Sequence, residues 1–411
     1  MNTDEPRSTV GVIAYLTDGS SPANATMNAM VWMVLALAVV GVAISLPATA
    51  LLCRVGHRLG ALDSTGAAGH TKQLRGVPNI GGVGIFLAVA LPLAVGLLAL
   101  HFVDTTLLTS WIPSLEPHLP RLLEGADQTI SSTTTALAML GGMIVLHALG
   151  LIDDRRSLNP WLKLLVQVVV AAVMAIWFDV RLMSLLGTWP SIIVTILWIV
   201  VVINAINFMD NMDGLAGGVS AIAAALFMVA CIVNHQWFIA ATLALLVGGL
   251  VGFLVLNFHP AKIFMGDSGS FVIGFLLAVL TARTTYYDPQ QADFPLGGGW
   301  YGVFMPLIVL AIPLYDFTVV TLIRLKQGRN PLIGDQQHFS HRLVQRGLSQ
   351  RGAVVVIWAA AAVTGIGGVS LGRLDAWQAA LVGAQTLLVL IMIALFEHAS
   401  RHTAAGNDRP S

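Results

Sequence analysis

The sequence has few charged residues and almost no cysteine. Lysine, arginine, aspartate and glutamate make up 10% of the 411 residues, whereas hydrophobic residues make up 56%. A soluble domain carries about 25% charged residues, so this composition excludes a soluble globular protein. Cys53 and Cys231 both lie in apolar stretches, which excludes a disulfide framework and a cysteine-based metal site. The first 26 or so residues lack the basic start of a cleavable signal peptide, so the first apolar segment is expected to direct membrane insertion.

Apolar segments of bilayer-spanning length, about 20 residues, recur along the whole chain. We count about eleven, at residues 28–53, 79–101, 132–152, 161–178, 188–206, 214–233, 237–257, 269–287, 300–324, 352–371 and 376–397. The sequence therefore predicts an all-α, polytopic integral membrane protein with about eleven transmembrane helices. Residues 28–397 would form a single transmembrane domain, between a polar extracytoplasmic segment at 1–27 and a polar cytoplasmic tail at 398–411.

Basic residues are distributed unevenly between the two sets of loops. Sixteen of the 21 lysines and arginines fall in one set of loops and ends, and five in the other. Cytoplasmic loops are the ones enriched in lysine and arginine. We therefore predict a protein of the cell's inner membrane, with its N-terminus outside and its C-terminus in the cytoplasm. The expected surroundings are membrane lipid, and we predict no nucleic acid partner.

Four polar clusters interrupt the apolar pattern, and all fall on the predicted cytoplasmic side. They lie at residues 153–154, 207–213, 262–270 and 335–342. An ion or proton pathway would instead place carboxylates near the middle of the membrane. A one-sided set of clusters favours an active site at the cytoplasmic surface.

The stretch NAINFMDNMDGLAGG spaces polar side chains three residues apart, at Asn204, Asn207, Asp210 and Asp213. Neighbours at this spacing lie close on one side of a helix, and the series forms an oblique stripe. Oxygen ligands without histidine or cysteine suit a hard cation such as Mg²⁺ that holds phosphate. The alternative for Asp213 is a helix cap, because an apolar segment begins directly after it.

Asp153 and Asp154 end the third apolar segment. Adjacent side chains on a helix diverge by about 100°, so one carboxylate can face a site while the other pairs with Arg155 or Arg156. A solvated turn with paired charges is the alternative. Pro160 stands near the start of the next segment, which is typical of the first turn of a helix.

The stretch GDSGS places Asp267, Ser268 and Ser270 where the eighth apolar segment begins. The free backbone N–H groups and the positive end of a helix bind phosphate at such a position. Asp267 is equally suited to bind a metal ion that bridges phosphate oxygens. An ordinary helix start remains the alternative for this stretch taken alone.

The longest cytoplasmic loop, residues 324–351, is also the most basic, and it contains His338, His341 and Arg342. Basic side chains at this position suit contacts to a diphosphate. A zinc site is a weaker interpretation, because zinc requires three or four ligands. Lys72 and Arg75, just before the second apolar segment, are further candidates for contact with an anionic ligand.

These motifs, in this order, resemble those of the polyprenyl-phosphate N-acetylhexosamine-1-phosphate transferases, glycosyl transferase family 4. The resemblance covers about residues 60–350 and includes Gly81-Gly82, GLIDD with Leu158, Lys163 and Gln167, NAINFMDNMDGLAGG, PAKIFMGDSGS, IPLYDF around Asp316, and DQQHFSHRL. Two positions depart from the bacterial N-acetylglucosamine pattern. Gln73 stands where histidine is usual, and Ser340 replaces the middle histidine of a His-x-His-His motif.

The resemblance implies transfer of N-acetylhexosamine 1-phosphate, most simply N-acetylglucosamine 1-phosphate, from a UDP-sugar to undecaprenyl phosphate. UMP would be released and a lipid-linked cell-envelope glycan begun. Mg²⁺ is the implied cofactor, with Mn²⁺ as a substitute, and a homodimer is left open. The implied residues are Asp153, Asp154, Asp210 and Asp267 for catalysis, Asp267 and Asp154 for the metal, Asp213, Asn257 and Phe264 for the uridine, and Asn207, Lys72, Arg75, His338, His341 and Arg342 for the rest of the substrate.

Other functions remain open at this stage. Within the family, the alternatives are a phospho-N-acetylmuramoyl-pentapeptide transferase or an enzyme for another UDP-amino sugar. Outside the family, they are a membrane transporter, a scaffold without catalysis, or a CDP-alcohol phosphotransferase. Acidic residues confined to one side disfavour a transporter, and the complete set of aspartates disfavours a scaffold. Asp210-x-x-Asp213-Gly lacks the Ala-Arg continuation of the CDP-alcohol motif.

Overall fold

A computed structural model describes residues 22–59, 76–102, 119–284, 300–330 and 338–406, and these form helices joined by short turns, with no β-strand within those ranges. Ten helices among the described residues are long and apolar enough to cross a membrane, and a bent pair of helices makes an eleventh span if it is counted as one. The prediction of an all-α, multi-pass membrane protein is therefore confirmed. Of the predicted terminal segments, residues 22–27 belong to the helix Pro22–Leu59 and residues 398–406 to the helix Ala376–Gly406, whereas residues 1–21 and 407–411 lie outside the described residues.

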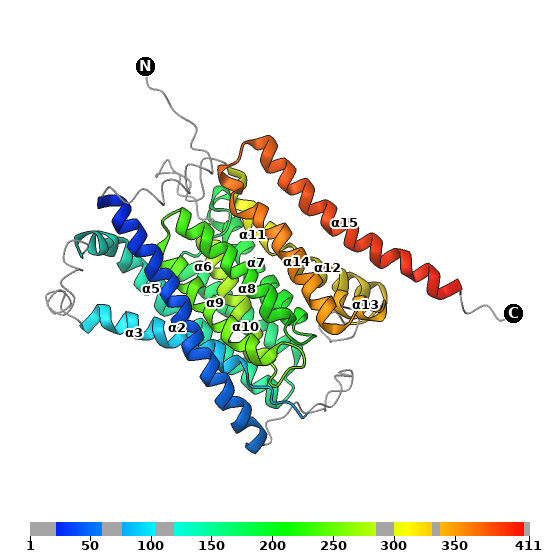
Figure 1. The fold of residues 1–411 in the computed structure, drawn as a ribbon. Helices are drawn as coiled ribbons and strands as arrows, with labels where there is room; N and C mark the ends of the chain where they lie inside the picture. The colour runs from blue at the N-terminus through cyan, green and yellow to red at the C-terminus, as the bar shows by residue number, and fades with distance from the viewer. Residues whose placement is uncertain (1–21, 60–75, 103–118, 285–299, 331–337, 407–411) are drawn as a thin grey trace.

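The spanning helices are α2 (Pro22–Leu59), α3 (Gly82–Phe102), α5 (Leu119–Arg155), α6 (Pro160–Trp177), α7 (Thr188–Met209), α8 (Leu215–Val233), α9 (Trp237–Asn257), α10 (Gly266–Thr284), α14 (Gln350–Val369) and α15 (Ala376–Gly406). The shorter helices are η2 (Ser184–Leu186), η3 (Trp300–Phe304), α11 (Met305–Val309), α12 (Ala311–Lys326), α13 (Phe339–Gln345) and η4 (Leu371–Arg373). In Figure 1, α2 and α15 descend in the same direction, which agrees with an odd number of crossings.

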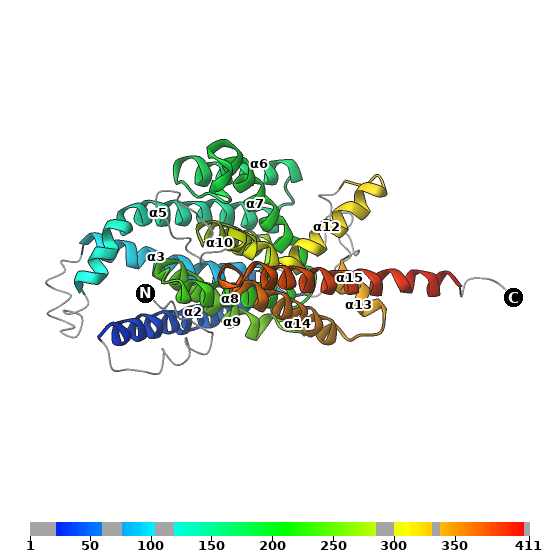
Figure 2. The same ribbon diagram turned by 90° about the horizontal axis from the view of Figure 1, so that it is seen from above.

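The ninth span is broken, which corrects the expectation of one continuous apolar segment at 300–324. Residues Tyr301–Val309 and Ala311–Lys326 meet at 69°. The break places Pro306 and Pro313 each in the first turn of its own helix, where the missing N–H of proline costs no hydrogen bond. Figure 2 shows that α12 consequently leaves the bundle at an angle.

The most enclosed helix is α10, which lies in the middle of the bundle (Figure 2). In the apolar 18-residue stretch of α10, 89% of the residues are buried, whereas 11% are buried in the corresponding stretch of α15. A helix that is apolar on all sides is buried either in protein or in lipid. The spanning stretch of α10 is also less hydropathic than that of α15, with mean values of 1.2 and 2.4, as expected of a helix enclosed by protein.

Small residues let α3 and α5 approach the first turn of α10 closely. A Cβ atom added at Gly82 would lie 2.3 Å from the backbone nitrogen of Gly269, and one added at Gly150 would lie 2.3 Å from that of Ser268. Such contacts between helix backbones are typical of small residues in membrane proteins. The Gly82 N–H also donates to the Met265 carbonyl at 2.9 Å. The start of α10 is therefore held from two sides by backbone contacts.

Candidate active site

The polar clusters come together at one end of the bundle, around the first turn of α10. Lys163 Nζ lies 2.9 Å from Asp153 Oδ2 and 3.2 Å from Asp267 Oδ2, so its ammonium group bridges the two carboxylates. Asn207 Nδ2 donates to Asp267 Oδ1 at 2.9 Å. We call these four residues the acidic centre. They come from α5, α6, α7 and α10, and the prediction that clusters distant in sequence share one end of the bundle is confirmed.

Asp154 faces the backbone at the start of α10. Its Oδ1 accepts a hydrogen bond from the Asp267 N–H at 2.8 Å, and its Oδ2 accepts one from the Ser268 N–H at 3.2 Å. Asn79 Nδ2 adds a third donor at 3.3 Å. Two of the N–H groups that the sequence left open to a phosphate are therefore already taken by the Asp154 carboxylate, which stabilises the positive end of the helix.

A glycine makes the approach of Asp154 feasible. Gly266 has a φ of +72°, in the left-handed region that glycine adopts without strain. A Cβ atom at Gly266 would lie 2.5 Å from Asp154 Oδ2. The glycine of the GDSGS stretch thus serves both the turn into α10 and the contact with Asp154.

Asp153 points in the other direction, as the spacing of adjacent residues on a helix predicts. Its Oδ1 accepts from the Leu158 N–H at 2.7 Å, and its Oδ2 pairs with Lys163. Asp153 is thus the carboxylate that faces the site, whereas Asp154 binds backbone N–H groups in place of Arg155 or Arg156, so the expected pairing with an arginine is wrong. The two adjacent aspartates have separate tasks: Asp153 belongs to the acidic centre, and Asp154 holds the helix that carries Asp267.

The polar residues after Asn204 do not form one stripe, because α7 ends at Met209. Asn204 Nδ2 donates to Gln167 Oε1 at 2.7 Å and so faces α6. Asn207 faces α10, where it contacts Asp267. Asp210 lies at the C-cap of α7 and donates its N–H to the Asn207 carbonyl at 3.1 Å. Asn204 and Asn207 thus serve different neighbours, α6 and α10.

Asp213 fastens the connection between α9 and α10. Its Oδ2 accepts from the Ala261 N–H at 3.1 Å and lies 2.8 Å from His259 Nδ1. The N-cap of α8 is Gly214, with a φ of +77° and no side-chain hydrogen bond. The alternative in which Asp213 caps α8 is therefore wrong. Its predicted contact with a uridine remains a prediction.

Asn257, the last residue of α9, links the turn between α7 and α8 to the connection between α9 and α10. Its Oδ1 accepts from the Gly214 N–H at 3.0 Å, and its Nδ2 donates to the Ile263 carbonyl at 2.8 Å. The side chain is buried, and both ends bind the backbone. Phe264, the residue after Ile263, is half-buried. The predicted roles of Asn257 and Phe264 toward the uridine stay predictions.

A second polar group lies where α12 meets α13, and we call it the histidine group. His338 Nδ1 and Asp316 Oδ2 are 2.8 Å apart, both side chains are buried, and the Phe339 N–H donates to Asp316 Oδ1 at 2.8 Å. Ser340 Oγ donates to Asn211 Oδ1 at 2.5 Å. Ser340 is therefore part of the packing between α13 and the α7–α8 turn, at the position where the family pattern has histidine.

The other basic candidates are placed only in part. His341 and Arg342 lie on α13, next to the histidine group, and are half-buried. Within the described ranges, no three His, Cys, Asp or Glu side chains are arranged to hold a metal ion, so nothing favours the zinc alternative for His338 and His341. Lys72 and Arg75 lie outside the described residues.

Comparison with known proteins places the chain in a family. Residues 136–285 match the family described as glycosyl transferase family 4. A decaprenyl-phosphate N-acetylglucosaminephosphotransferase of Mycolicibacterium smegmatis is 31% identical over 340 residues, which are 77% of this chain and 77% of that protein. The chain belongs to glycosyl transferase family 4. The matched residues run from α5 to the end of α10 and contain the whole acidic centre.

Two further relatives in family 4 have similar names. A probable undecaprenyl-phosphate N-acetylglucosaminyl 1-phosphate transferase of Bacillus subtilis is 27% identical over 339 residues, 80% of this chain and 82% of that protein. An undecaprenyl-phosphate alpha-N-acetylglucosaminyl 1-phosphate transferase of Escherichia coli is 29% identical over 283 residues, 66% of this chain and 72% of that protein. The family is one of polyprenyl-phosphate N-acetylhexosamine-1-phosphate transferases, as the motifs predicted.

Three residues of this family 4 site received no role from the sequence: Lys163, Asp316 and Asn79. A lysine near the start of an apolar span is itself a signal, because a charge at membrane depth is costly unless it has a partner. The same applies to Asp316, which is buried in the second half of the broken span. Asn79 carried no such signal, because its partner Asp154 is remote in sequence.

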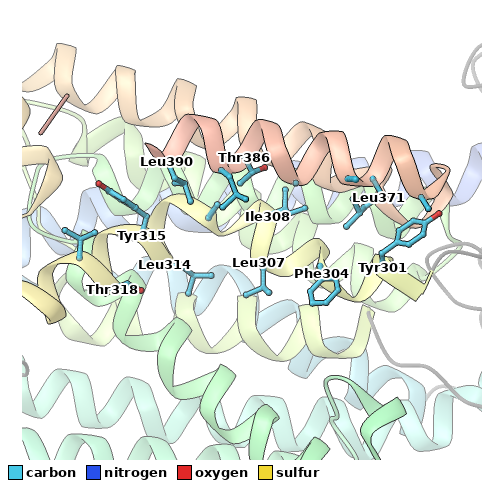
Figure 3. A pocket seen from close by; sticks show the side chains of 17 residues that line it. Tyr301, Phe304, Leu307, Ile308, Leu314, Tyr315, Thr318, Leu371, Thr386 and Leu390 are labelled. Atoms are coloured by element: carbon cyan, nitrogen blue, oxygen red, sulfur yellow. The ribbon is translucent and has the colours of Figure 1, made fainter. Parts of the chain in front are cut away.

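An apolar groove of about 730 Å³ lies between α11, α12 and α15. Figure 3 shows side chains from these helices that face the groove, among them Leu307, Ile308, Leu314, Thr318, Thr386 and Leu390. Tyr315 lines one end of the groove, and its ring lies edge-on to Phe339, with centroids 6.4 Å apart. Because Phe339 follows His338, this end of the groove lies beside the histidine group.

Proposed function

We propose that this family 4 protein transfers N-acetylglucosamine 1-phosphate from a UDP-sugar to a polyprenyl phosphate and releases UMP. The observation that carries the proposal is the acidic centre, in which Lys163 bridges Asp153 and Asp267 inside the region that matches the family. The names of the relatives, which specify N-acetylglucosamine 1-phosphate transfer to undecaprenyl or decaprenyl phosphate, support the same reaction. Undecaprenyl phosphate is the acceptor that we favour.

The residues of the acidic centre fit a magnesium ion. Mg²⁺ in phosphate-handling sites is held by one or two carboxylates together with waters and substrate phosphates. Asp153 and Asp267 offer two carboxylates close enough to share one ammonium group. We assign Asp267 and Asp153 as the ligands, and we assign to Asp154, predicted as a ligand from the sequence, the positioning of Asp267. When bound, Mg²⁺ or its substitute Mn²⁺ would neutralise phosphate charge.

The chain's own side chains then orient and neutralise two anionic substrates. A lipid phosphate is largely ionised at pH 7, since its second pKa is about 6, so its oxygen attacks the sugar-bearing phosphorus without prior loss of a proton. The bond from that phosphorus to the UMP oxygen breaks. Asp153 positions the acceptor, and Lys163 supplies positive charge where the two phosphates meet. His338, His341 and Arg342 hold the diphosphate or the sugar.

The membrane orientation is part of the proposal. The distribution of lysine and arginine supports a location of the acidic centre and the histidine group on the cytoplasmic side of the inner membrane. A UDP-sugar is a soluble cytoplasmic substrate and a polyprenyl phosphate is a lipid, so the reaction requires a site at the inner surface of the membrane. The N-terminus would then be outside and the C-terminus inside.

Release of UMP tests the reaction directly. The purified full-length chain in detergent is incubated with Mg²⁺, undecaprenyl phosphate and UDP-N-acetylglucosamine, other UDP-N-acetylhexosamines or UDP-N-acetylmuramoyl-pentapeptide. We expect UMP with UDP-N-acetylglucosamine, only when lipid phosphate is present. UMP with the pentapeptide substrate alone would transfer the assignment to the muramoyl-pentapeptide activity. Absence of UMP with every donor, while a relative is active under the same conditions, would refute the transferase proposal.

The groove beside α12 is proposed to receive part of the isoprenoid tail of the acceptor. Gly383 on α15 lines this groove, and a Cβ atom there would meet nothing within 4 Å. Gly383→Trp should fill the groove without moving the backbone. We expect the KM for undecaprenyl phosphate to rise about tenfold or more. This rise corresponds to the loss of roughly 1.5–3 kcal/mol, the binding free energy gained when a few methylene groups are buried. The KM for the UDP-sugar should not change.

A matched glycine controls for the size of the new side chain. A Cβ atom added at Gly96 on α3 also meets nothing within 4 Å, and Gly96 lies away from the groove. Gly96→Trp should leave both KM values unaltered. Equal effects of the two substitutions, or no effect of Gly383→Trp with the long acceptor, would remove the groove from the acceptor's path.

A further inference from the structure

Lys163 occupies the space between the only two carboxylates of the acidic centre. Its ammonium group lies 2.9 Å from Asp153 Oδ2 and 3.2 Å from Asp267 Oδ2. The side chains of Lys163, Asp153 and Asp267 are 24%, 12% and 24% exposed, so water and small ions can reach the group. A point charge on a flexible four-carbon stem is the kind of group that can enter and leave such a position.

The other two carboxylate oxygens of the acidic centre each already accept a hydrogen bond from a protein donor. Asn207 already donates to Asp267 Oδ1, and the Leu158 N–H donates to Asp153 Oδ1. The oxygens of Asp154 are directed at the N–H groups of α10 and at Asn79. A cation that approaches the acidic centre therefore meets the same two Oδ2 atoms that Lys163 binds.

The charges favour an exchange over joint occupation. Two carboxylates and one ammonium group carry a net charge of −1, so the pair attracts a second cation. A divalent cation on the same oxygens would neutralise both carboxylates and would repel an ammonium group held within 4 Å. The released lysine would then be a free positive charge next to the place where two phosphates have to meet.

We propose that Lys163 and a divalent cation bind Asp153 and Asp267 in alternation, so that entry of the cation releases the Lys163 ammonium group toward the anionic substrates. The proposal rests on the proposed function, because that function is what requires a divalent cation at this site. It assigns to Lys163 a role in two states: in one it neutralises the carboxylates, and in the other it is available to phosphate.

The reactivity of the lysine amine tests the exchange. The full-length chain contains four lysines, at positions 72, 163, 262 and 326. The protein in detergent is treated briefly with an amine-reactive acylating reagent, with and without Mn²⁺, and modification of each lysine is measured by mass spectrometry. We expect Lys163 to react several-fold faster with Mn²⁺, because its ammonium group has lost both carboxylates. Lys262 and Lys326, which are exposed, serve as internal controls and should not change.

Binding of Mn²⁺, followed by electron paramagnetic resonance, gives an independent readout. Lys163→Gln removes the competitor and should lower the Kd for Mn²⁺ several-fold, while Asp267→Asn should abolish the site. Unchanged or slower reaction of Lys163 when Mn²⁺ is bound would refute the exchange, and so would failure of Mn²⁺ to bind or an unchanged Kd in Lys163→Gln. UMP release by the same preparation is measured separately, so the transferase proposal can survive the failure of this one.

Discussion

Asp267→Asn is expected to lower kcat for UMP release by about a thousandfold or more. Removal of one preorganised charged group from an active site costs on the order of 10²–10⁴ in rate. Asparagine has nearly the same shape and can still accept the hydrogen bond from Asn207, but it loses the charge that binds Lys163 and the proposed metal ion. The helix end should persist, because the backbone N–H groups of α10 bind Asp154 and not the Asp267 side chain.

An exposed aspartate provides the matched control for the loss of charge. Asp179 pairs with Arg181 in the connection between α6 and α7, at the end of α6 opposite to Lys163. Asp179 has a φ of +52°, a conformation that asparagine also tolerates. Asp179→Asn should therefore retain normal kcat and thermal stability. Near-normal turnover of Asp267→Asn, with both variants monodisperse in detergent, would remove Asp267 from the reaction.

Gly150→Ala is expected to abolish activity by displacing the start of α10. The added Cβ atom would lie 2.3 Å from the backbone nitrogen of Ser268 and 2.4 Å from its Cα. Backbone atoms cannot rotate away as a side-chain tip can, so α5 and α10 have to separate. Overpacking costs about 1–3 kcal/mol or more, and the separation would also move Asp154 away from the N–H groups that it caps.

Another glycine of α5 distinguishes this contact from a general effect on the helix. A Cβ atom added at Gly141 meets nothing within 4 Å. Gly141→Ala should be neutral or slightly stabilising, because alanine favours the helix by about 0.5–1 kcal/mol over glycine. Thermal unfolding in detergent and UMP release measure both variants. If Gly150→Ala were as stable and active as Gly141→Ala, the close contact between α5 and α10 would not be needed.

Much of the fold could be predicted because it follows from local properties of the sequence. Apolar segments of about 20 residues predict spans wherever they occur, and most of the helices lie where the segments predicted them. Pro160 marks the beginning of α6, and the Asn159 side chain caps that helix. The ninth segment was predicted less well. It is as apolar as its neighbours, and whether Pro306 and Pro313 bend or break it depends on what the two halves pack against.

The sequence predicted which residues belong to the candidate site, but it predicted their contacts with one another less well. Asp153, Asn207 and Asp267 do meet, and the convergence was foreseen from the one-sided distribution of the clusters. The pairing of Asp153 with Lys163 was not foreseen, since two arginines stand closer in sequence. The alternative prediction for Asp213 was a helix cap, but its carboxylate binds the connection between α9 and α10.

The sequence by itself determined that this protein crosses the membrane repeatedly, that its polar clusters share one end, and that its motifs are those of family 4. Composition, span length and motif spacing are properties of the chain that no packing can alter. Only the tertiary structure decided which of two adjacent, chemically identical aspartates faces Lys163 and which caps α10. The reason is that the partners, Lys163 for Asp153 and the N–H groups of α10 for Asp154, are brought to α5 by helix packing, and the N–H groups lie more than a hundred residues away.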